Sequence, residues 1–268
     1  MTVGETTTVE ITSGSGEYGV TNLNSSIANA TLDGTTITIN ALAEGNAKIE
    51  VTDKQTDQTI TIEVTVTASG ETEGHAPAGV VAVDLGLPSG TLWANMNVGA
   101  SAPEDYGDYF AWGETKPKDV YTLETYAYWR DTNGDGFVDN NELVDLGSDI
   151  AGKKYYDAAT ANWGSPWKMP TKEQFEELIG NCTSEWTQEN GIYGRKFTGS
   201  NGNTIFLPAA GERWNGEFDY VGTYGLYWSS TLNESYPYYE YDLNVNSWDA
   251  YWYGFVDRFY GLSVRPVR

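Results

Sequence analysis

Thr59-Ile-Thr-Ile-Glu-Val-Thr-Val66 alternates branched apolar residues with polar ones at every second position. The same alternation recurs in segments 36–39 and 48–51. Successive side chains of a strand point to opposite faces of a sheet, so this pattern predicts half-buried strands. Turn-forming residues such as Asp33-Gly34 separate these segments. Several short strands between turns predict a small all-β sandwich over residues 1–68.

The composition changes after residue 68. Segment 69–78 has no periodicity and contains Gly and Pro, so it predicts a linker, and His75, the only histidine of the chain, lies inside it. Residues 79–268 form a different material, since the last 57 residues hold 17 aromatic residues, no Lys and four Arg. The chain is therefore expected to have two domains, residues 1–68 and 79–268.

Helix signals in the second domain are few. Thr171-Lys-Glu-Gln174 has the spacing of a capping box, and Phe175, Leu178 and Ile179 follow at helical spacing before Gly180. Segment 157–161 predicts another short helix, with Trp163 against the core. The remainder indicates short strands and long loops, so we expect an α+β domain.

Charge and composition disfavour several classes of function. The chain carries 15 Lys and Arg against 38 Asp and Glu, a net charge of −23, which disfavours nucleic acid and anionic membranes as partners. No stretch has the roughly 20 apolar residues of a membrane span. A single cysteine, Cys182, excludes an internal disulfide and a multi-cysteine zinc site, and a single histidine, which lies in the linker, excludes histidine metal clusters and most nucleophile–base pairs. Glu176 and Glu177 are neighbours on a predicted helix, so their side chains diverge and do not form the carboxylate pair of a glycosidase. Cys182 is expected to be a buried apolar residue. From these observations together we expect no enzyme activity.

Segment 131–142 matches the twelve-residue calcium loop of EF-hand proteins. Oxygen-bearing side chains stand at its first, third, fifth, ninth and twelfth positions, with glycine at the sixth and a backbone carbonyl at the seventh. The predicted calcium ligands are Asp131, Asn133, Asp135, Phe137, Asp139 and Glu142. Segment 126–130 lacks the pattern of an amphipathic helix, so we expect an EF-hand-like loop whose calcium stabilises an insertion, with a solvated acidic turn as the alternative.

Three motifs of the first domain occur in a recognisable order: segments 11–18, 37–39 and 45–53. In this order they resemble the bacterial immunoglobulin-like group 2 family. The resemblance implies an immunoglobulin-like sandwich that serves as a spacer or adhesion module on an exported bacterial protein.

Six motifs are spread over nearly all of the second domain: segments 83–94, 109–114, 167–171, 206–211, 227–230 and 260–267. In this order they resemble the Fibrobacter succinogenes major paralogous domain family. It implies a C-type-lectin-like fold on the surface of Bacteroidetes or similar bacteria. Formylglycine-generating enzymes on the related fold use two cysteines, and this chain has one.

The resemblance also implies that the C-terminal tail forms the ligand-binding face. Some proteins with this ending are targets of diversity-generating retroelements, which randomise adenine-containing codons; a tail rich in Tyr, Asn and Asp but without Lys is typical of that process. Tyr and Trp offer large, rigid contact surfaces with a polar tip. Glu212 is a candidate contact position, and the candidate ligand-binding residues that follow it are Trp214, Asn215, Glu217, Asp219, Tyr220, Tyr224, Asn233, Tyr236, Tyr238, Tyr239, Tyr241, Asn244, Asn246, Trp248, Asp249, Tyr251, Tyr253 and Asp257. Tyr227, Trp228, Trp252 and Leu262 are expected to pack in the core.

These features predict a secreted or surface-anchored bacterial ligand-binding protein or adhesin, whose export or lipoprotein signal has been removed. Its ligand is expected to be a carbohydrate, whose rings stack on aromatic faces, or a protein held by aromatic anchors. The alternative is a structural surface or pilus-associated protein whose aromatic tail docks a partner subunit.

Overall fold

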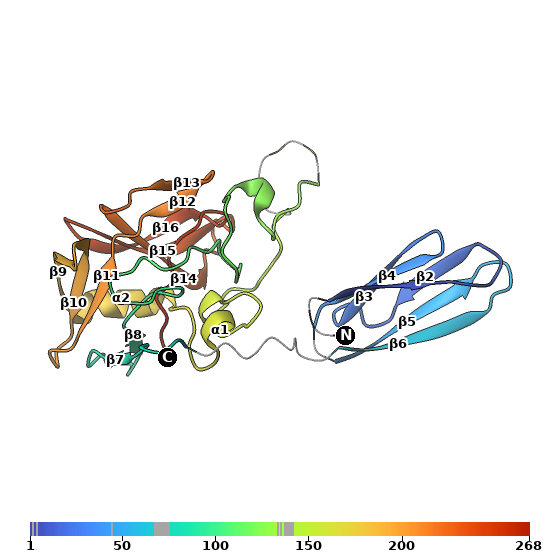
Figure 1. Ribbon diagram of the computed structural model, residues 1–268, viewed down its shortest axis with the longest axis horizontal. Coiled ribbons are helices and arrows are strands. Elements are labelled where there is room, and N and C mark those ends of the chain that lie inside the picture. Colours follow the sequence, from blue (N-terminus) through green and yellow to red (C-terminus); the bar gives the residue numbers. More distant parts are fainter. Residues whose placement is uncertain are drawn as a thin grey trace. The chain divides into compact units, whose positions relative to one another are not determined.

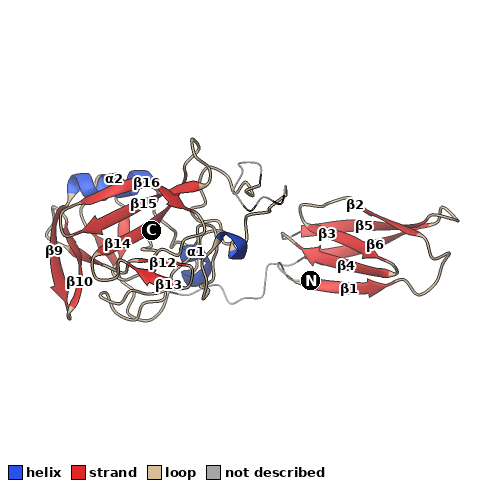
Figure 2. Ribbon diagram, turned by 90° about the horizontal axis from the view of Figure 1, so that it is seen from above, coloured by secondary structure: helices blue, strands red, loops and turns tan. Residues whose placement is uncertain are grey.

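The computed structural model describes residues 1, 3, 5–43, 45–66, 76–132, 134, 136 and 142–268. Contacts within the chain divide it into two compact units, Met1–Thr72 and Glu73–Arg268, and strands arranged in small antiparallel sheets predominate in both (Figures 1 and 2). None of the helices among these residues has the length and apolar character needed to cross a membrane.

The N-terminal unit consists of two three-stranded antiparallel sheets, of order β1-β4-β3 and β2-β5-β6. Its strands are β1 (Thr6–Glu10), β2 (Tyr18–Asn22), β3 (Ala28–Asp33), β4 (Thr36–Ala41), β5 (Gly45–Asp53) and β6 (Thr59–Val66). Both sheets contribute to one apolar core, in which Ile37 and Ile39 of β4 and Ile49 of β5 are at most 1% exposed. The three segments predicted from alternation lie in β4, β5 and β6, so these strand predictions are confirmed.

In β6, the burial predicted from alternation can be compared with the observed burial of each apolar residue. Val64 and Val66 are buried, and Ile62 is partly buried, as the period of two predicts. Ile60, which belongs to the same series, is 63% exposed. Ile60 lies near the start of β6, which is an edge strand of its sheet, opposite the buried Val51 of β5.

The C-terminal unit combines four small sheets with two short α-helices among its described residues. The helical elements are the 3-10 turn η1 (Leu123–Thr125), α1 (Ala158–Trp163) and α2 (Lys172–Asn181). The strands are β7 (Ala82–Asp84), β8 (Leu92–Ala94), β9 (Thr183–Glu189), β10 (Ile192–Thr198), β11 (Thr204–Pro208), β12 (Glu212–Trp214), β13 (Glu217–Asp219), β14 (Tyr224–Leu232), β15 (Tyr239–Asn246) and β16 (Ala250–Asp257).

The sheet β14-β15-β16 lies at the centre of this unit and is covered on both faces (Figure 2). On one face, Leu243 of β15 packs in the same apolar cluster as Phe175 and Leu178 of α2. On the other face, Leu226 and Trp228 of β14 join a second cluster built largely from loop residues. Of the four residues expected in the core, Tyr227, Trp228 and Leu262 are fully buried.

Both predicted helices are present. The Thr171 hydroxyl accepts a hydrogen bond from the Gln174 backbone N–H at 3.3 Å, and the Gln174 side chain accepts one from the Thr171 N–H at 2.9 Å, so the capping box that starts α2 is confirmed. The helix continues to Asn181, one residue past the predicted stop at Gly180. Asp157 caps α1, and Trp163 is 4% exposed.

The last residues of the chain return to the start of this unit. Val267 forms isolated bridges with Trp93 and with Lys168, so three segments distant in sequence meet there. The Arg265 guanidinium is fully buried and donates to the Asn97 side chain at 2.8 Å, with two further bonds to the carbonyls of Ala94 and Phe206. These bonds compensate the burial of its charge, since an unpaired guanidinium in the core would be costly.

Candidate ligand-binding face

Strand β16 is an edge strand, because among the described residues it pairs only with β15. Its aromatic side chains are unusually open: Tyr251 is 40% exposed, Tyr253 46% and Phe255 50%. Tyr251 and Tyr253 are two residues apart and share one face of the strand. The register between β15 and β16 shifts after Tyr253, and Phe255 lies beyond that shift. Trp252, on the other face, is 41% exposed, so the expectation that it packs in the core is wrong.

Phe255 is the centre of an aromatic patch. Ring centroids of Tyr236, Tyr239 and Tyr253 lie 5.4, 5.7 and 5.6 Å from its own, and Tyr238 lies 4.5 Å from Tyr239. We refer to these five residues as the aromatic patch. Rings held against one another lose little further conformational entropy on binding, as a contact surface requires.

The exposed Trp252 is held in place from the side of α2. The Lys172 ammonium lies 4.2 Å from the centroid of the Trp252 ring and 5.0 Å from that of Tyr241, and the two rings meet edge to face. Tyr241 also fills the space beside Gly254, where an added Cβ would lie 2.7 Å from its ring. Tyr241, one of the predicted binding residues, is therefore partly buried and packs against Gly254 and Trp252.

Four carboxyl groups gather beside this sheet, and we call Glu212, Asp219, Asp242 and Asp257 the carboxylate cluster. Glu212 and Asp219 are directly opposite each other in the β12–β13 hairpin. Burial, followed by the charges of Asp219 and Asp257, raises the pKa of Glu212 to about 7. Burial alone raises the pKa of Asp257 to about 6.

Asp242 is the most deeply placed member of the cluster. It is fully buried, and neither carboxylate oxygen has a hydrogen-bond partner among the described residues. Burial, with the charge of Glu212 as a second cause, raises its pKa well above the usual range for an aspartate. A buried carboxyl without a partner is a conflict that folded proteins rarely retain.

Tyrosines surround the carboxylate cluster. Burial and the charges of Asp257, Glu212 and Asp219 raise the pKa of Tyr260 to about 12. Burial and the charge of Asp242 raise the pKa of Tyr251. Both tyrosine rings therefore interact with carboxyl groups of the cluster.

Two cavities open next to these residues. The first, of about 250 Å³, is lined by Tyr220, Tyr224, Leu226 and Asn244. The second, of about 460 Å³, is lined by Trp186, Tyr193, Gly222, Thr223, Tyr224, Ser247 and Trp248. Trp248, at the turn between β15 and β16, is 81% exposed, and Tyr224 belongs to both cavities.

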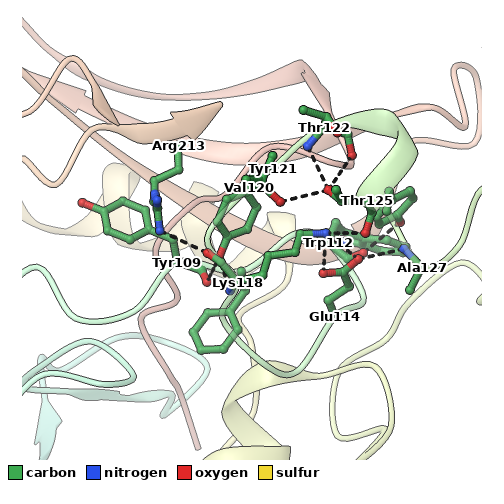
Figure 3. A network of polar contacts seen from close by, with 12 residues as sticks. Tyr109, Trp112, Glu114, Lys118, Val120, Tyr121, Thr122, Thr125, Ala127 and Arg213 are labelled. Carbon is green, nitrogen blue, oxygen red and sulfur yellow. Dashed lines mark hydrogen bonds and ion pairs between the residues drawn. The ribbon is translucent and has the colours of Figure 1, made fainter. Parts of the chain in front are cut away.

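The two arginines that adjoin this cluster in sequence point elsewhere. Arg213 follows Glu212, but its guanidinium donates to the backbone carbonyls of Lys118 at 3.1 Å and Asp119 at 2.8 Å (Figure 3). Lys118 in turn bonds the carboxylate of Glu114 at 2.9 Å (Figure 3). These contacts fasten segment 114–125 to β12.

Arg258 follows Asp257 and is likewise used within the fold. Its guanidinium lies 4.5 Å from the centroid of Trp112, and its Nε is 3.3 Å from the carboxylate of Glu240. Arg258 and Glu240 are 3% and 0% exposed, so they form a buried ion pair. The positive charges next to Glu212 and Asp257 therefore do not neutralise the carboxylate cluster.

Three predicted binding residues are buried and bonded within the fold. Asn233 donates from its amide to the Gly254 carbonyl at 2.7 Å. Asn246 accepts from the backbone N–H of Trp248 at 2.8 Å, and the amide of Asn246 is 3.4 Å from the Asn244 oxygen. Asn233, Asn244 and Asn246 are 4, 8 and 4% exposed. Asn233 and Asn246 hold turns by these hydrogen bonds, and among the three only Asn244 lines one of the two cavities.

The other predicted residues are spread around the face. Trp214, Asn215 and Glu217 lie in the β12–β13 hairpin, with Asn215 at its turn, and are exposed. Asp249 is exposed in the turn before β16. Sequence reasoning missed Phe218, Phe255, Trp186 and Tyr193, because it favoured polar-tipped residues of the tail over Phe and over strands β9 and β10.

The predicted calcium loop is only partly within the described residues. Asn133, Asp135, Phe137 and Asp139 lie outside them. The Asp131 carboxylate accepts from the backbone N–H groups of Gly134 and Gly136, at 2.6 and 3.1 Å. The buried Glu142 accepts from the backbone and hydroxyl of Thr132, at 2.8 and 2.9 Å.

Hydrogen bonds to carboxylate oxygens of Asp131 and Glu142 are compatible with a calcium loop, whose ligands are held in the same way. Among the residues that the structure describes, no group of three or more His, Cys, Asp or Glu side chains has metal-binding geometry. The calcium site thus stays a prediction.

Cys182 caps the C-terminal end of α2 and is partly buried. Burial and the charge of Glu177 raise its pKa, which disfavours the reactive thiolate. His75 lies outside the described residues.

No family model matches the chain, and no curated protein matches it. Solved structures that it matches include surface layer protein SbsC. Its domains 1–6 share 13% identity and a TM-score of 0.23, over 76% of this chain and 22% of that one. The S-layer protein rSbsC(31-844) shares 13% identity and a TM-score of 0.23, over 94% and 23% of the two chains. Domains 5–6 share 12% identity and a TM-score of 0.23, over 98% and 90%. This chain thus spans less than a quarter of the length of the first two, and likenesses this low carry no argument about fold or function.

Proposed function

We propose that this chain is a bacterial cell-surface ligand-binding protein whose C-terminal unit, a C-type-lectin-like domain, binds a carbohydrate or a protein. The binding surface is the outer side of β16 with the aromatic patch and the residues around the two cavities. The N-terminal unit, an immunoglobulin-like domain, serves as a spacer.

The observation that carries this proposal is the exposure of Tyr251, Tyr253 and Phe255 side by side on an edge strand. Single exposed apolar residues are ordinary, but a contiguous aromatic surface marks a contact site. Carboxyl and hydroxyl groups adjoin the rings, as in interfaces where aromatic anchors are combined with polar groups.

The edge position of β16 also favours the second candidate function, docking of a partner subunit in a surface assembly. An edge strand presents backbone N–H and C=O groups that can pair with a strand of another chain. A diversified tail would favour the first function, since variation at each position disrupts a fixed subunit contact. A near-repeat of the tail codons that differs at adenines, beside a reverse-transcriptase gene, is the genomic observation expected in that case.

The experiment that tests the proposal is a binding screen of the full chain on glycan and protein arrays, with calcium and with chelator. Saturable binding to a glycan or to a protein from another cell supports the ligand-binding function. Binding confined to the products of neighbouring genes supports the subunit function instead.

A further inference from the structure

We propose that the carboxylate cluster is a binding site for a cationic side chain, arginine or lysine, of a basic segment in a protein ligand. This inference rests on the proposed function and names the chemistry of its ligand. It selects a protein over a neutral carbohydrate.

The first argument is the arrangement of like charges. Glu212 and Asp219 are directly opposite in an antiparallel pair, a position in which two carboxylates repel. The charges of Asp219 and Asp257 both act on Glu212, so each of these two carboxyl groups adds to the repulsion at Glu212. In the described part of the chain, none of the ion pairs joins a Lys or Arg to any member of the cluster.

The carboxyl group of Asp242 is buried without a hydrogen-bond partner among the described residues, as expected of a group that a ligand can bind. Side chains two residues apart on a strand share a face, so Asp242 is on the same face as Asn244, which lines the 250 Å³ cavity. Across the strands, Asp242 pairs in register with Tyr253, and its charge acts on Tyr251. The Asp242 carboxyl interacts with the charge of Glu212, yet it has no hydrogen-bond donor among the described residues.

The two arginines that adjoin the cluster in sequence, Arg213 and Arg258, bind other groups of the fold. Strand alternation turns Arg213 away from Glu212, and Arg213 bonds the backbone of Lys118 (Figure 3). Arg258, next to Asp257, pairs with the buried Glu240. Because Arg213 and Arg258 are bound to other groups of the fold, a positive charge that compensates the carboxylate cluster would come from a ligand.

The kind of cation follows from the surroundings. No three carboxyl groups of the described residues have metal-binding geometry, so the cluster is more widely spread than an ion cage. A guanidinium or ammonium group on a flexible side chain can reach spread oxygens and can lie over tyrosine rings, as cation–π contacts require. Tyr251 interacts with the charge of Asp242, Tyr260 interacts with the charges of Asp257, Glu212 and Asp219, and the exposed Tyr220 follows Asp219 in the chain, so these three residues offer such rings.

The test uses isothermal titration calorimetry of the full chain at 150 mM salt, where long-range charge effects are screened. The probes are acetylated tetra-arginine amide and its neutral analogue, tetra-citrulline amide. Citrulline has nearly the shape of arginine without the charge. The net charge of −23 attracts any basic peptide, so charge-matched variants are needed.

The site variant is Glu212→Gln/Asp257→Asn, and the matched control is Glu173→Gln/Glu185→Gln, which removes two exposed carboxylates on α2 and β9. We expect tetra-arginine to bind wild type and control alike, and to bind the site variant at least about tenfold more weakly. Tetra-citrulline should bind none of them. Melting temperatures at pH 7 check that the site variant is folded.

Absence of tetra-arginine binding, or equal loss in both variants, would overturn the inference. It would also be overturned by an array ligand that is a neutral glycan and binds the site variant as tightly as wild type, and in that case the proposed function would stand. A protein ligand lost in the site variant and retained in the control supports both.

Discussion

At the scale of single residues, the carboxylate cluster contradicts the rules that most of the chain follows. Arg265 is fully buried with three hydrogen-bond acceptors, whereas Asp242 is fully buried with no donor among the described residues. Residues that break local rules without compensation concentrate at functional sites. The contrast between these two buried charged groups is why the cluster, and not the core, is assigned to ligand binding.

The raised pKa of Glu212 predicts that folding stability depends on pH. Its carboxyl has a pKa of about 7 when folded and 4.5 as the ordinary value, so the folded state holds the proton more tightly. The resulting stability is complete below pH 4.5 and is lost as pH rises through 7. The charges of Asp219 and Asp257 act on Glu212 in the same direction as burial, and the charge of Glu212 in turn raises the pKa of Asp242 and of Tyr260.

Melting temperatures of wild type and Glu212→Gln between pH 5 and pH 8 measure this effect. The variant should lose less stability than wild type over that range, because glutamine does not ionise. The control Glu173→Gln, at an exposed position on α2, should follow the wild-type profile. Parallel profiles for all three proteins would show that Glu212 ionises normally.

Which residues contact a ligand was only partly predictable at this scale. The composition of the tail indicates an aromatic and acidic surface, and Tyr251 and Tyr253 are indeed exposed on β16, which ends at Asp257. Asn244 and Asn246 look the same in sequence, yet they are buried, because a polar residue in a strand can bond a neighbouring turn as well as a ligand. Only the three-dimensional neighbours distinguish these cases.

At the scale of elements, α2 was predictable because its signals are local. Thr171 and Gln174 are three residues apart, and the apolar residues follow at helical spacing. Strand β16 was not, since its exposure depends on having β15 on one side and no described strand on the other. Its composition predicts that Trp252 packs in the core, but Trp252 is exposed because β16 lies at the edge of its sheet.

The capping box gives a prediction for α2. Thr171→Ala removes the acceptor of the Gln174 N–H and should cost about 1 kcal/mol, a fall of roughly 2–4 °C in the melting temperature. Thr171→Ser keeps a hydroxyl at the same position and should melt close to wild type. If serine is as destabilising as alanine, packing of the threonine methyl, and not the cap, is responsible.

At the scale of the whole molecule, two units of different composition are expected to have different tasks. The N-terminal unit has a core of small aliphatic residues, typical of a plain β-sheet module. The C-terminal unit holds the aromatic patch, the carboxylate cluster and the predicted calcium loop. The division between the two was visible in composition alone, whereas the pairing of strands into small sheets depended on contacts distant in sequence.

The predicted calcium loop gives a test of the C-terminal unit. A bound ion stabilises the folded state by about 2.7 kcal/mol at a hundredfold excess over its dissociation constant. Calcium should therefore raise the melting temperature of wild type by several degrees over chelator, and should not do so in Asp131→Ala. An identical melting curve in calcium and in chelator would reject a stabilising ion.

The central claim is that the exposed aromatic residues of β16 bind a ligand and do not hold the fold together. The most direct measurement compares wild type with Tyr251→Ala/Tyr253→Ala/Phe255→Ala, for melting temperature and for affinity to the strongest array ligand. The account predicts a fall of no more than about 5 °C and an affinity at least about tenfold weaker. Tyr155→Ala, which truncates a tyrosine 42% exposed outside the tail, should retain full affinity. A triple variant that unfolds, or one that binds as tightly as wild type, would contradict the account.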